Sequence, residues 1–269
     1  MTAAAGRPFR LAAMLAVLVA SLLAPSAATA LEMQEVRSGE GPIRVLTFNV
    51  LGRNKDYARF AAYLERVDPD LVLLQEAGRE WIAATPLKLY PFRRVGKRMV
   101  IASRLKFGPT ESVADPRLAI VGDPFMRLQV ELASGGTRHL VSVYNVHPTS
   151  PRVQDGMERR LEDYATLAAN LAKEPPGRAL IVAGDFNAAP GSDLLDGLVA
   201  GAGLTLADGG TLAVATRFAR EYELPSWLGV AIDHVATRGP FRVLGREVGP
   251  DLGSDHLPVV VDMEFAPPP

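Results

Sequence analysis

Short runs of aliphatic and β-branched residues recur along this chain, and most of them lead into a cluster of Asn, Asp, Glu or His. Such runs, bounded by polar segments, are typical of β-strands. The segments that predict strands are residues 43–48, 71–74, 99–102, 119–121, 127–132, 140–146, 179–183, 231–237 and 258–265. This pattern requires a fold in which much of the chain lies in β-sheets.

Fewer segments show helical spacing. Residues 57–67 and 153–171 place apolar side chains three and four positions apart, and a shorter helix is expected over 193–199 with Ser192 as its N-cap. Pro175-Pro176-Gly177 is expected to end the second helix. Several strands follow one another without a helix between them, which favours two mixed sheets packed face to face over a doubly wound parallel sheet. The predicted class is α/β (α+β), a four-layer αββα sandwich of two mixed β-sheets flanked by helices.

The first thirty residues have the pattern of a secretory signal peptide. Arg7 and Arg10 precede an apolar run over residues 11–24, and Ala28-Thr29-Ala30 offers the small side chains that a signal peptidase reads. The run is shorter than the roughly 20 residues that a membrane-spanning helix needs, although a retained anchor stays an alternative. We expect an exported protein, periplasmic or secreted, with a signal peptide at 1–30, one domain at 31–266 and a disordered tail at 267–269.

The composition excludes several classes of chemistry. The chain has no cysteine, which rules out disulfides, thiolate metal sites, a cysteine nucleophile and a lipid-modified N-terminal cysteine. The formal net charge is −1, and it becomes −3 without residues 1–30, which carry two arginines and no acids. A generally basic nucleic-acid binder is therefore excluded, and any such binding needs a local patch. The chain also lacks the G-x-S-x-G, H-E-x-x-H and Walker A motifs of serine hydrolases, zincins and P-loop enzymes.

The polar clusters at the strand ends carry the candidate chemistry. An antiparallel strand in a mixed sheet reverses which of its ends faces a given edge, so these clusters are expected to share one rim. Asn and carboxylate oxygens are ligands for hard cations such as Mg²⁺, Mn²⁺ or Ca²⁺. Gathered carboxylates cannot all stay ionised without a positive charge among them, which favours a bound cation over strongly raised pKa values.

Each polar residue has a simpler interpretation when it is taken alone. Asn49 would end a strand, Asp233 would be a turn residue, and Ser254-Asp255-His256 would be a turn held by Asx-type hydrogen bonds. However, all of the four histidines except His139 lie in these clusters. The joint occurrence of the clusters at the ends of separate strands favours one shared site.

Six motifs follow one another in a specific order. They are T-F-N at 47–49, L-Q-E at 74–76, N-V-H-P at 145–148, G-D-F-N at 184–187, I-D-H at 232–234 and S-D-H at 254–256. This succession resembles the endonuclease/exonuclease/phosphatase superfamily, the fold shared by DNase I-like nucleases, abasic-site endonucleases, inositol polyphosphate 5-phosphatases and bacterial sphingomyelinases. The resemblance runs from about residue 43 to 265, and residues 147–160 are similar to the small exported bacterial branch. The Tyr-x-x-Asn motif of abasic-site enzymes is absent in that form, which argues against abasic DNA as substrate.

The resemblance implies a metal-dependent hydrolase of phosphate esters, most simply a phosphodiesterase or nuclease. Asn49 and Glu76 are expected to hold Mg²⁺, or alternatively Mn²⁺ or Ca²⁺, with Asp255 beside the ion. Asp185 is expected to orient or deprotonate the attacking water, and Asn187 to hydrogen-bond the phosphate.

The two histidines of the motifs complete the implied catalytic set. His256 is expected to stabilise charge on a non-bridging oxygen, with Asp233 or Asp255 fixing its tautomer. His147 is expected to contact the phosphate or to help protonate the leaving group. Gly184, which has no Cβ, lets the backbone approach closely.

The substrate is less constrained than the reaction. We expect Asn145 and Arg159 to bind substrate, although Arg159 would otherwise only decorate a helix face. A basic stretch would contact a polyanion or form a solvated hairpin surface, and Trp227 would stack on a base, meet lipid or pack in a loop. The stretch comprises Arg93, Arg94, Lys97, Arg98, Arg104 and Lys106.

Two alternatives to the phosphodiesterase stay open at this stage. The first is a phospholipid or inositol phosphate hydrolase of the same fold. The second is a non-catalytic module that binds a phosphate ligand. The expected partner in each case is a phosphate ester, with no stable protein partner and a monomeric chain.

Overall fold

The computed structural model describes residues 33–109, 124–207, 214–218 and 228–267, which lie in one compact unit, Met33–Pro269. The predicted signal peptide, the predicted strand at 119–121, Trp227 and the last two residues of the predicted tail lie outside the described residues. Within the described part of the chain, none of the helices is long and apolar enough to cross a membrane.

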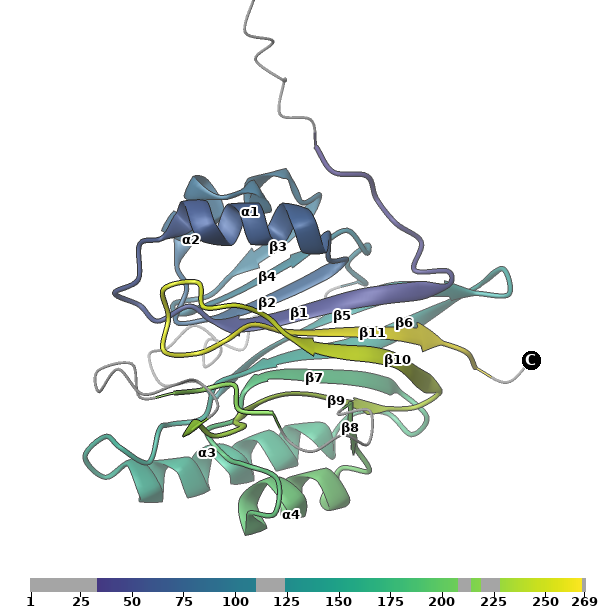
Figure 1. Ribbon diagram of the computed structural model, residues 1–269. Coiled ribbons are helices and arrows are strands. Elements are labelled where there is room, and N and C mark those ends of the chain that lie inside the picture. The colour runs from purple at the N-terminus through teal and green to yellow at the C-terminus, as the bar shows by residue number, and fades with distance from the viewer. Residues whose placement is uncertain (1–32, 110–123, 208–213, 219–227, 268–269) are drawn as a thin grey trace, which may run out of the picture. The chain divides into compact units, whose positions relative to one another are not determined.

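The described strands form two mixed sheets (Figure 1). One has six strands in the order β10-β11-β1-β2-β4-β3, and the other has five in the order β5-β6-β7-β9-β8. The first sheet comprises β1 Pro42–Asn49, β2 Leu71–Gln75, β3 Phe92–Val95, β4 Met99–Ser103, β10 Phe241–Val248 and β11 Val259–Phe265. The second comprises β5 Phe125–Ser134, β6 Thr137–Val146, β7 Ala179–Asp185, β8 Thr205–Leu206 and β9 Asp233–Arg238. Each sheet contains one parallel pair among antiparallel ones, as predicted.

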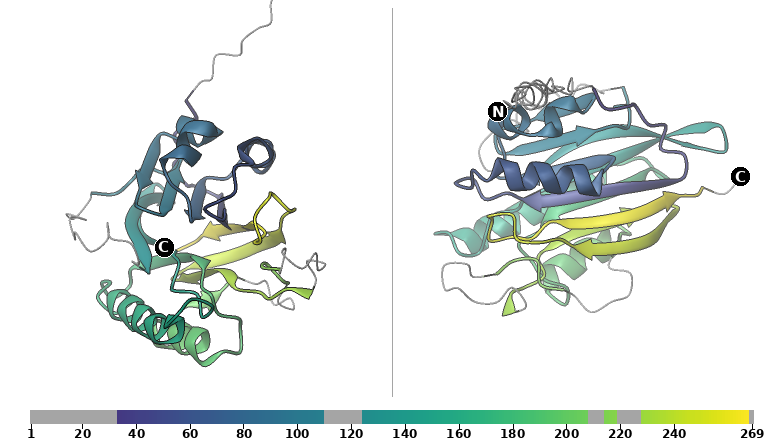
Figure 2. Two further views of the ribbon diagram at one scale, coloured as in Figure 1. Left: turned by 90° about the vertical axis from the view of Figure 1, so that its left-hand side faces the viewer. Right: turned by 45° about the horizontal axis from the view of Figure 1, so that its top comes forward.

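Helices cover the outer face of each sheet, which confirms the predicted αββα sandwich (Figures 1 and 2). Helices α1 Tyr57–Val67 and α2 Arg79–Ala84 and the 3₁₀ helix η1 Pro86–Leu89 pack on the six-stranded sheet. Helices α3 Gly156–Leu171 and α4 Asp193–Gly201 pack on the five-stranded sheet. The sequence pattern does not predict α2, η1 or the strands β3, β8 and β10. Elements as short as α2, η1, β3 and β8 show little periodicity, and β10 carries Gly245 and three charged residues among its apolar ones.

Helix α3 differs from its prediction at its N-terminal end. It begins at Gly156 rather than at residue 153, and the first apolar positions of the predicted stripe are about half exposed. This part of α3 lies beside the loops that follow β6 and β7, where the Thr149 N–H donates to Asp163, rather than over the aliphatic face of the sheet. The exposed positions are Val153, Met157 and Leu161, and the buried ones are Tyr164, Leu167 and Leu171.

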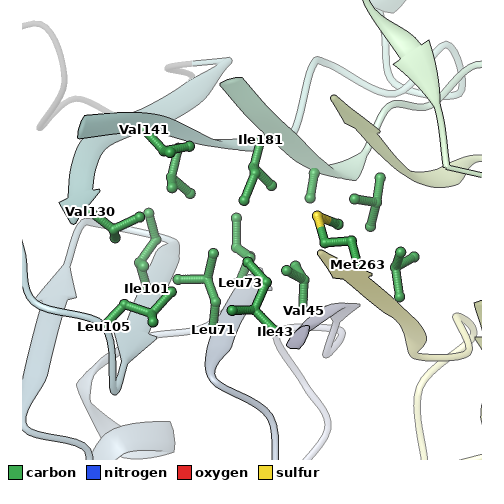
Figure 3. Packing of buried hydrophobic residues seen from close by; sticks show 14 of the residues in the cluster. Ile43, Val45, Leu71, Leu73, Ile101, Leu105, Val130, Val141, Ile181 and Met263 are labelled. Atoms are coloured by element: carbon green, nitrogen blue, oxygen red, sulfur yellow. The ribbon is translucent and has the colours of Figure 1, made fainter. Parts of the chain in front are cut away.

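An aliphatic layer fills the space between the two sheets (Figure 3). In β1, Ile43 and Val45 point into this layer, while Leu46 and Phe48 pack in the cluster beneath α1. Successive residues of a strand face opposite sides, so both faces of β1 are buried. Strands covered on both faces read as nearly continuous apolar runs, which explains the pattern that dominates the sequence.

The register of the strands brings their polar ends to one edge of the sandwich. Strands β1 and β2 run parallel with Asn49 opposite Gln75, and β6 and β7 also run parallel. Strand β9 runs antiparallel to β7, so Asp233 at its start lies opposite Asp185 at the end of β7. We call this edge, defined by these four residues, the strand-end rim; it lies on the left in Figure 1 and faces the viewer in the left view of Figure 2.

Gly184 allows β6 and β7 to pair closely at the strand-end rim. Its φ is +150°, and a Cβ at this position would lie 2.0 Å from the carbonyl oxygen and 2.8 Å from the nitrogen of Val146. Both are backbone atoms of the paired strand, so they cannot move aside without disturbing the ladder. This confirms that the backbone approaches closely at Gly184 because no Cβ is present.

We expect Gly184→Ala to lower the free energy of unfolding by about 2–4 kcal/mol, since it combines a backbone clash with an unfavourable φ. Gly197→Ala in α4 is the matched control, because nothing lies within 4 Å of its Cβ position and alanine favours a helix interior by about 0.5–1 kcal/mol. Urea denaturation measures both changes. A Gly184→Ala midpoint equal to that of the wild type would contradict this account of the rim.

Candidate active site

Asp185, the last residue of β7, lies at the centre of the strand-end rim. Its Oδ2 accepts a hydrogen bond from Asn49 Nδ2 at 3.0 Å. The same oxygen lies 3.6 Å from Nε2 of His147 and 3.6 Å from Nε2 of His256. The fold therefore gathers four separate segments of the chain, from both sheets, around one buried carboxylate.

Glu76 directly follows β2 and lies beside Asn49. Its Oε1 is 3.4 Å from Asn49 Nδ2, and its Oε2 accepts the Gly52 N–H at 2.9 Å and pairs with Arg98 Nη2 at 2.9 Å. Burial raises the pKa of Glu76, but the Gly52 hydrogen bond, His147 and Arg98 outweigh it and hold the pKa below its usual range. Glu76 is therefore an ionised carboxylate at neutral pH.

His256 and Asp233 form a buried pair behind Asp185. His256 Nδ1 lies 2.9 Å from Asp233 Oδ2 and 3.1 Å from Oδ1, which leaves Nε2 pointing at the central carboxylate. Thr216 Oγ1 donates to Asp233 Oδ2 at 2.7 Å and accepts the N–H groups of Ile232 and Asp233. A carboxylate on Nδ1 fixes the tautomer and the orientation of an imidazole ring.

The charge of this pair follows from its surroundings. Burial alone lowers the pKa of His256, but Asp233, Asp185 and Asp255 outweigh it and raise the pKa to about 9. Burial raises the pKa of Asp233, His256 opposes that shift, and Asp185 adds to it. The pair shares one proton, and we assign that proton to the imidazole because several carboxylates face it.

Asn187 lies two residues beyond Asp185 in a left-handed backbone conformation, with φ +49°. Its N–H donates to Asp185 Oδ1 at 2.8 Å, and its Nδ2 donates to the Pro148 carbonyl at 2.9 Å. Arg160 of α3 donates from Nη1 to the Asn187 carbonyl at 2.6 Å. The loop after β7 is therefore held both by its own carboxylate and by α3.

Asn145 does not lie where a substrate would contact it, so its prediction as a substrate-binding residue is wrong. The side chain is fully buried between the sheets. Its Nδ2 donates to the carbonyls of Leu74 and Val100, and its Oδ1 accepts from Gln75 Nε2 at 2.7 Å. Asn145 thus connects β6 with β2 and β4 of the opposite sheet.

The roles predicted for Asp255 and Arg159 stay predictions. Asp255 Oδ2 pairs with Arg217 Nη2 at 2.8 Å, and no hydrogen bond joins Asp255 to Asn49 or Glu76. The side chain of Arg159 is exposed, and it makes no hydrogen bond or ion pair with the described residues. Neither arrangement tests contact with an ion or a substrate.

The basic stretch of the sequence does not form one patch, because β4 divides it. Arg98 precedes β4 at the strand-end rim, where it pairs with Glu76. Arg104 and Lys106 follow β4 at its opposite end, where Arg104 pairs with Asp68 and Lys106 with Glu131. A continuous surface for a polyanion along this stretch is therefore not present among the described residues.

Thr216 and Arg160 also contribute to the site. The sequence pattern assigns no role to Thr216, and for Arg160 it allows either a phosphate contact or a place on a solvated helix face. Thr216 lies in a described segment, 214–218, that has no strand pattern of its own. Only tertiary structure places its hydroxyl on Asp233. Arg160 lies on the same helical stripe as Tyr164, and that periodicity is the one local signal that it faces the fold.

The donor set fits a hard divalent cation. Asp185, Asp233 and His256 present ligand atoms within 4.8 Å of one another. However, Asp233 is fully buried and its oxygens already bond to His256 and Thr216. Glu76, whose side chain is 20% exposed, offers carboxylate oxygens that an ion can reach from solvent, and the buried Asn49 lies beside it.

Residues 46–256 match the family model described as the Endonuclease/Exonuclease/phosphatase family. This chain therefore belongs to that family, as its motifs and its two-sheet sandwich indicate. The members of the family act on phosphoesters, so a phosphate-ester site is the general function that the fold and the motifs define. No curated protein matches the chain.

Solved structures share the fold. The Bacteroides vulgatus endonuclease/exonuclease/phosphatase is 17% identical, with a TM-score of 0.65 over 84% of this chain and 99% of that one. The Beutenbergia cavernae endonuclease/exonuclease/phosphatase is 21% identical, with a TM-score of 0.60 over 84% and 72%. D. rerio TDP2 in complex with a single-strand DNA product is 17% identical, with a TM-score of 0.56 over 83% and 99%.

His234, the second residue of β9, also supports the loop after β7. It is almost fully buried, with Nε2 3.0 Å from the Ala188 carbonyl and its ring edge-on to Phe186. Burial lowers the pKa of His234 to about 4, even though the hydrogen bond to Ala188 opposes the shift. The ring is therefore neutral at pH 7.

We expect His234 to make the fold acid-sensitive. Between pH 6.5 and pH 4 the unfolded chain binds a proton at this residue that the folded chain does not, so the free energy of unfolding falls as the pH drops. The loss reaches about 3 kcal/mol. Urea unfolding at several pH values measures this fall in the free energy of unfolding. We expect a smaller fall for His234→Gln than for wild type, and a fall equal to that of wild type for the control His139→Gln. Equal losses in all three proteins would contradict the assignment.

Proposed function

We propose that this chain hydrolyses phosphodiesters with an activated water and a divalent cation, with Mg²⁺ expected and Mn²⁺ or Ca²⁺ as alternatives. The observation that carries the proposal is the surroundings of Asp185 Oδ2, which lies 3.0–3.6 Å from Asn49 Nδ2, His147 Nε2 and His256 Nε2. A carboxylate that faces two imidazoles is suited to move protons during attack on a phosphorus centre.

Asp185 is proposed to take the proton of the attacking water as the new P–O bond forms. The hydrogen bonds from Asn49 Nδ2 and the Asn187 N–H hold its carboxylate in place. His256, protonated and backed by Asp233, donates from Nε2 to a non-bridging oxygen of the phosphate. His147 Nε2 delivers a proton to the leaving oxygen when its P–O bond breaks, and the Asn187 amide helps to hold the phosphate.

Glu76 and Asn49 are proposed to hold the cation, with Asp255 as a further residue near it. When bound, the ion supplies Lewis-acid polarisation of the phosphate and counters the charge that develops there. The chain's own part is to supply an ionised carboxylate, and the lowered pKa of Glu76 provides one across the neutral range.

Two observations support particular classes of phosphate ester as the substrate. TDP2, whose fold is similar, was solved with a single-strand DNA product, which supports a nucleic-acid diester as the first candidate. The exposed apolar side chains of Val153, just before α3, and of Met157 and Leu161 in its first two turns favour a phospholipid as the second. The signal-peptide pattern of residues 1–30 supports the further proposal that the protein acts after export.

Removal of divalent cations with a chelator tests whether the activity depends on a metal ion. We expect the purified protein to hydrolyse bis-p-nitrophenyl phosphate in Mg²⁺ and to lose this activity in EDTA, with recovery when excess Mg²⁺ is added. Plasmid DNA, sphingomyelin and inositol phosphates assayed in parallel identify the preferred ester. Turnover that resists EDTA would contradict the cation, and a folded protein without turnover on any ester would favour a binding module.

Single substitutions test whether Asp185 and His256 take part in catalysis. Asp185→Ala and His256→Ala should each lower kcat by at least about 100-fold, because each removes a proton carrier or a charge-stabilising donor. His139→Ala is the control, since His139 lies on β6 away from the rim and packs against Phe265. Rates close to wild type for either site variant would contradict the assignment.

A further inference from the structure

Two side chains of α3 hold the loop that carries Asn187. Tyr164 Oη donates to the Phe186 carbonyl at 2.9 Å, and Arg160 Nη1 donates to the Asn187 carbonyl at 2.6 Å. Residues four positions apart lie on the same face of a helix, one turn from each other. Arg160 and Tyr164, which we call the α3 clamp, therefore bind two consecutive carbonyls of the loop that begins at Asp185.

The loop contains one backbone conformation that residues other than glycine seldom adopt. Asn187 has φ +49°, in the left-handed region, which asparagine tolerates better than most residues because its short polar side chain can hydrogen-bond locally. In this conformation its N–H reaches Asp185 Oδ1 and its amide reaches Pro148. Rotation of the Phe186–Asn187 peptide would break the hydrogen bond from the Asn187 N–H to Asp185 Oδ1, and a change in the backbone of Asn187 would displace its side-chain amide.

Stability alone does not account for Arg160. Its Nε is buried and has no hydrogen-bond partner among the described residues, and Nη2 makes only a weak contact of 3.5 Å with Met157 Sδ. An unpaired buried donor is destabilising, and this offsets part of what the bond to Asn187 contributes to stability. The arrangement orients the loop more than it stabilises the fold.

We propose that Tyr164 and Arg160 are positioning residues, since Tyr164 holds the Phe186–Asn187 peptide and Arg160 holds the Asn187–Ala188 peptide. Together they keep the backbone of Asn187, its hydrogen bond to Asp185 and its side-chain amide in the geometry for catalysis. The proposal rests on the proposed hydrolysis for its kinetic consequence. Its structural consequence, protection of the Asn187 N–H, does not depend on turnover.

Matched controls separate positioning from a general structural role. Arg178 is also half-buried and donates to a backbone carbonyl, that of Leu140, but it precedes β7 at the end opposite Asp185. Tyr144 is also buried against α3, but its hydroxyl donates to Glu174 near the far end of that helix. Arg178→Met and Tyr144→Phe therefore remove the same groups from equivalent contacts away from the rim.

The experiment measures kcat and KM on bis-p-nitrophenyl phosphate, urea unfolding, and amide hydrogen exchange at Asn187 by NMR. Arg160→Met and Tyr164→Phe should each lower kcat about tenfold with KM within about twofold, and speed exchange at Asn187. Arg160→Lys, which keeps a donor and the charge, should recover part of kcat. The two control variants should change unfolding but leave kcat and Asn187 exchange unchanged.

Two results would overturn the clamp. One is wild-type kcat and exchange in both Arg160→Met and Tyr164→Phe; the other is an equal fall of kcat in the control variants, which would show a structural role only. If the wild-type protein has no turnover on any phosphate ester, the proposed function fails by itself. Exchange at Asn187 then decides the clamp alone, with faster exchange in the two clamp variants supporting it and unchanged exchange overturning it.

Discussion

The hydrogen bond from Asn49 Nδ2 to Asp185 Oδ2 joins the two sheets at the edge where the chemistry lies. Asn49 ends β1 of one sheet and Asp185 ends β7 of the other, so the bond forms only if both strands end at the same level. The aliphatic layer between the sheets sets that level, because close-packed side chains allow little sliding. The site therefore depends on the packing of the whole sandwich and not on any one loop.

A second polar contact starts at the rim residue Gln75 and crosses the buried interior between the sheets. Gln75 donates to Asn145 Oδ1 at 2.7 Å, and Asn145 donates to two carbonyls of the opposite sheet. Buried amides are stable only when they are paired, so this contact also specifies how the sheets align. The two polar residues of the N-V-H motif therefore have different roles. Asn145 connects the two sheets, and His147 lies next to the carboxylate of Asp185.

Negative charge is concentrated at the rim and is balanced locally. Arg98 pairs with Glu76, Arg217 pairs with Asp255, and the proton on His256 faces Asp233 and Asp185. Separation from water would raise the pKa of Glu76 in this partly buried site, but the Gly52 hydrogen bond, His147 and Arg98 keep its carboxylate ionised. A phosphate ester and a cation would enter a site whose charges are already ordered, which is the condition for electrostatic preorganisation.

Local patterns predicted eight of the eleven described strands, the helices of residues 57–67 and 193–199 and most of the residues that gather at the rim, because each of these features rests on an apolar run, a helical spacing or the motif that ends a strand. Strands β3, β8 and β10, the position of Asn145, the division of the basic stretch by β4, and the contributions of Thr216 and Arg160 emerge only in the folded molecule. These depend on which partner a side chain meets across the fold. No local pattern encodes that partner, since the same Asn or Arg is equally suited to solvent, substrate or a buried carbonyl.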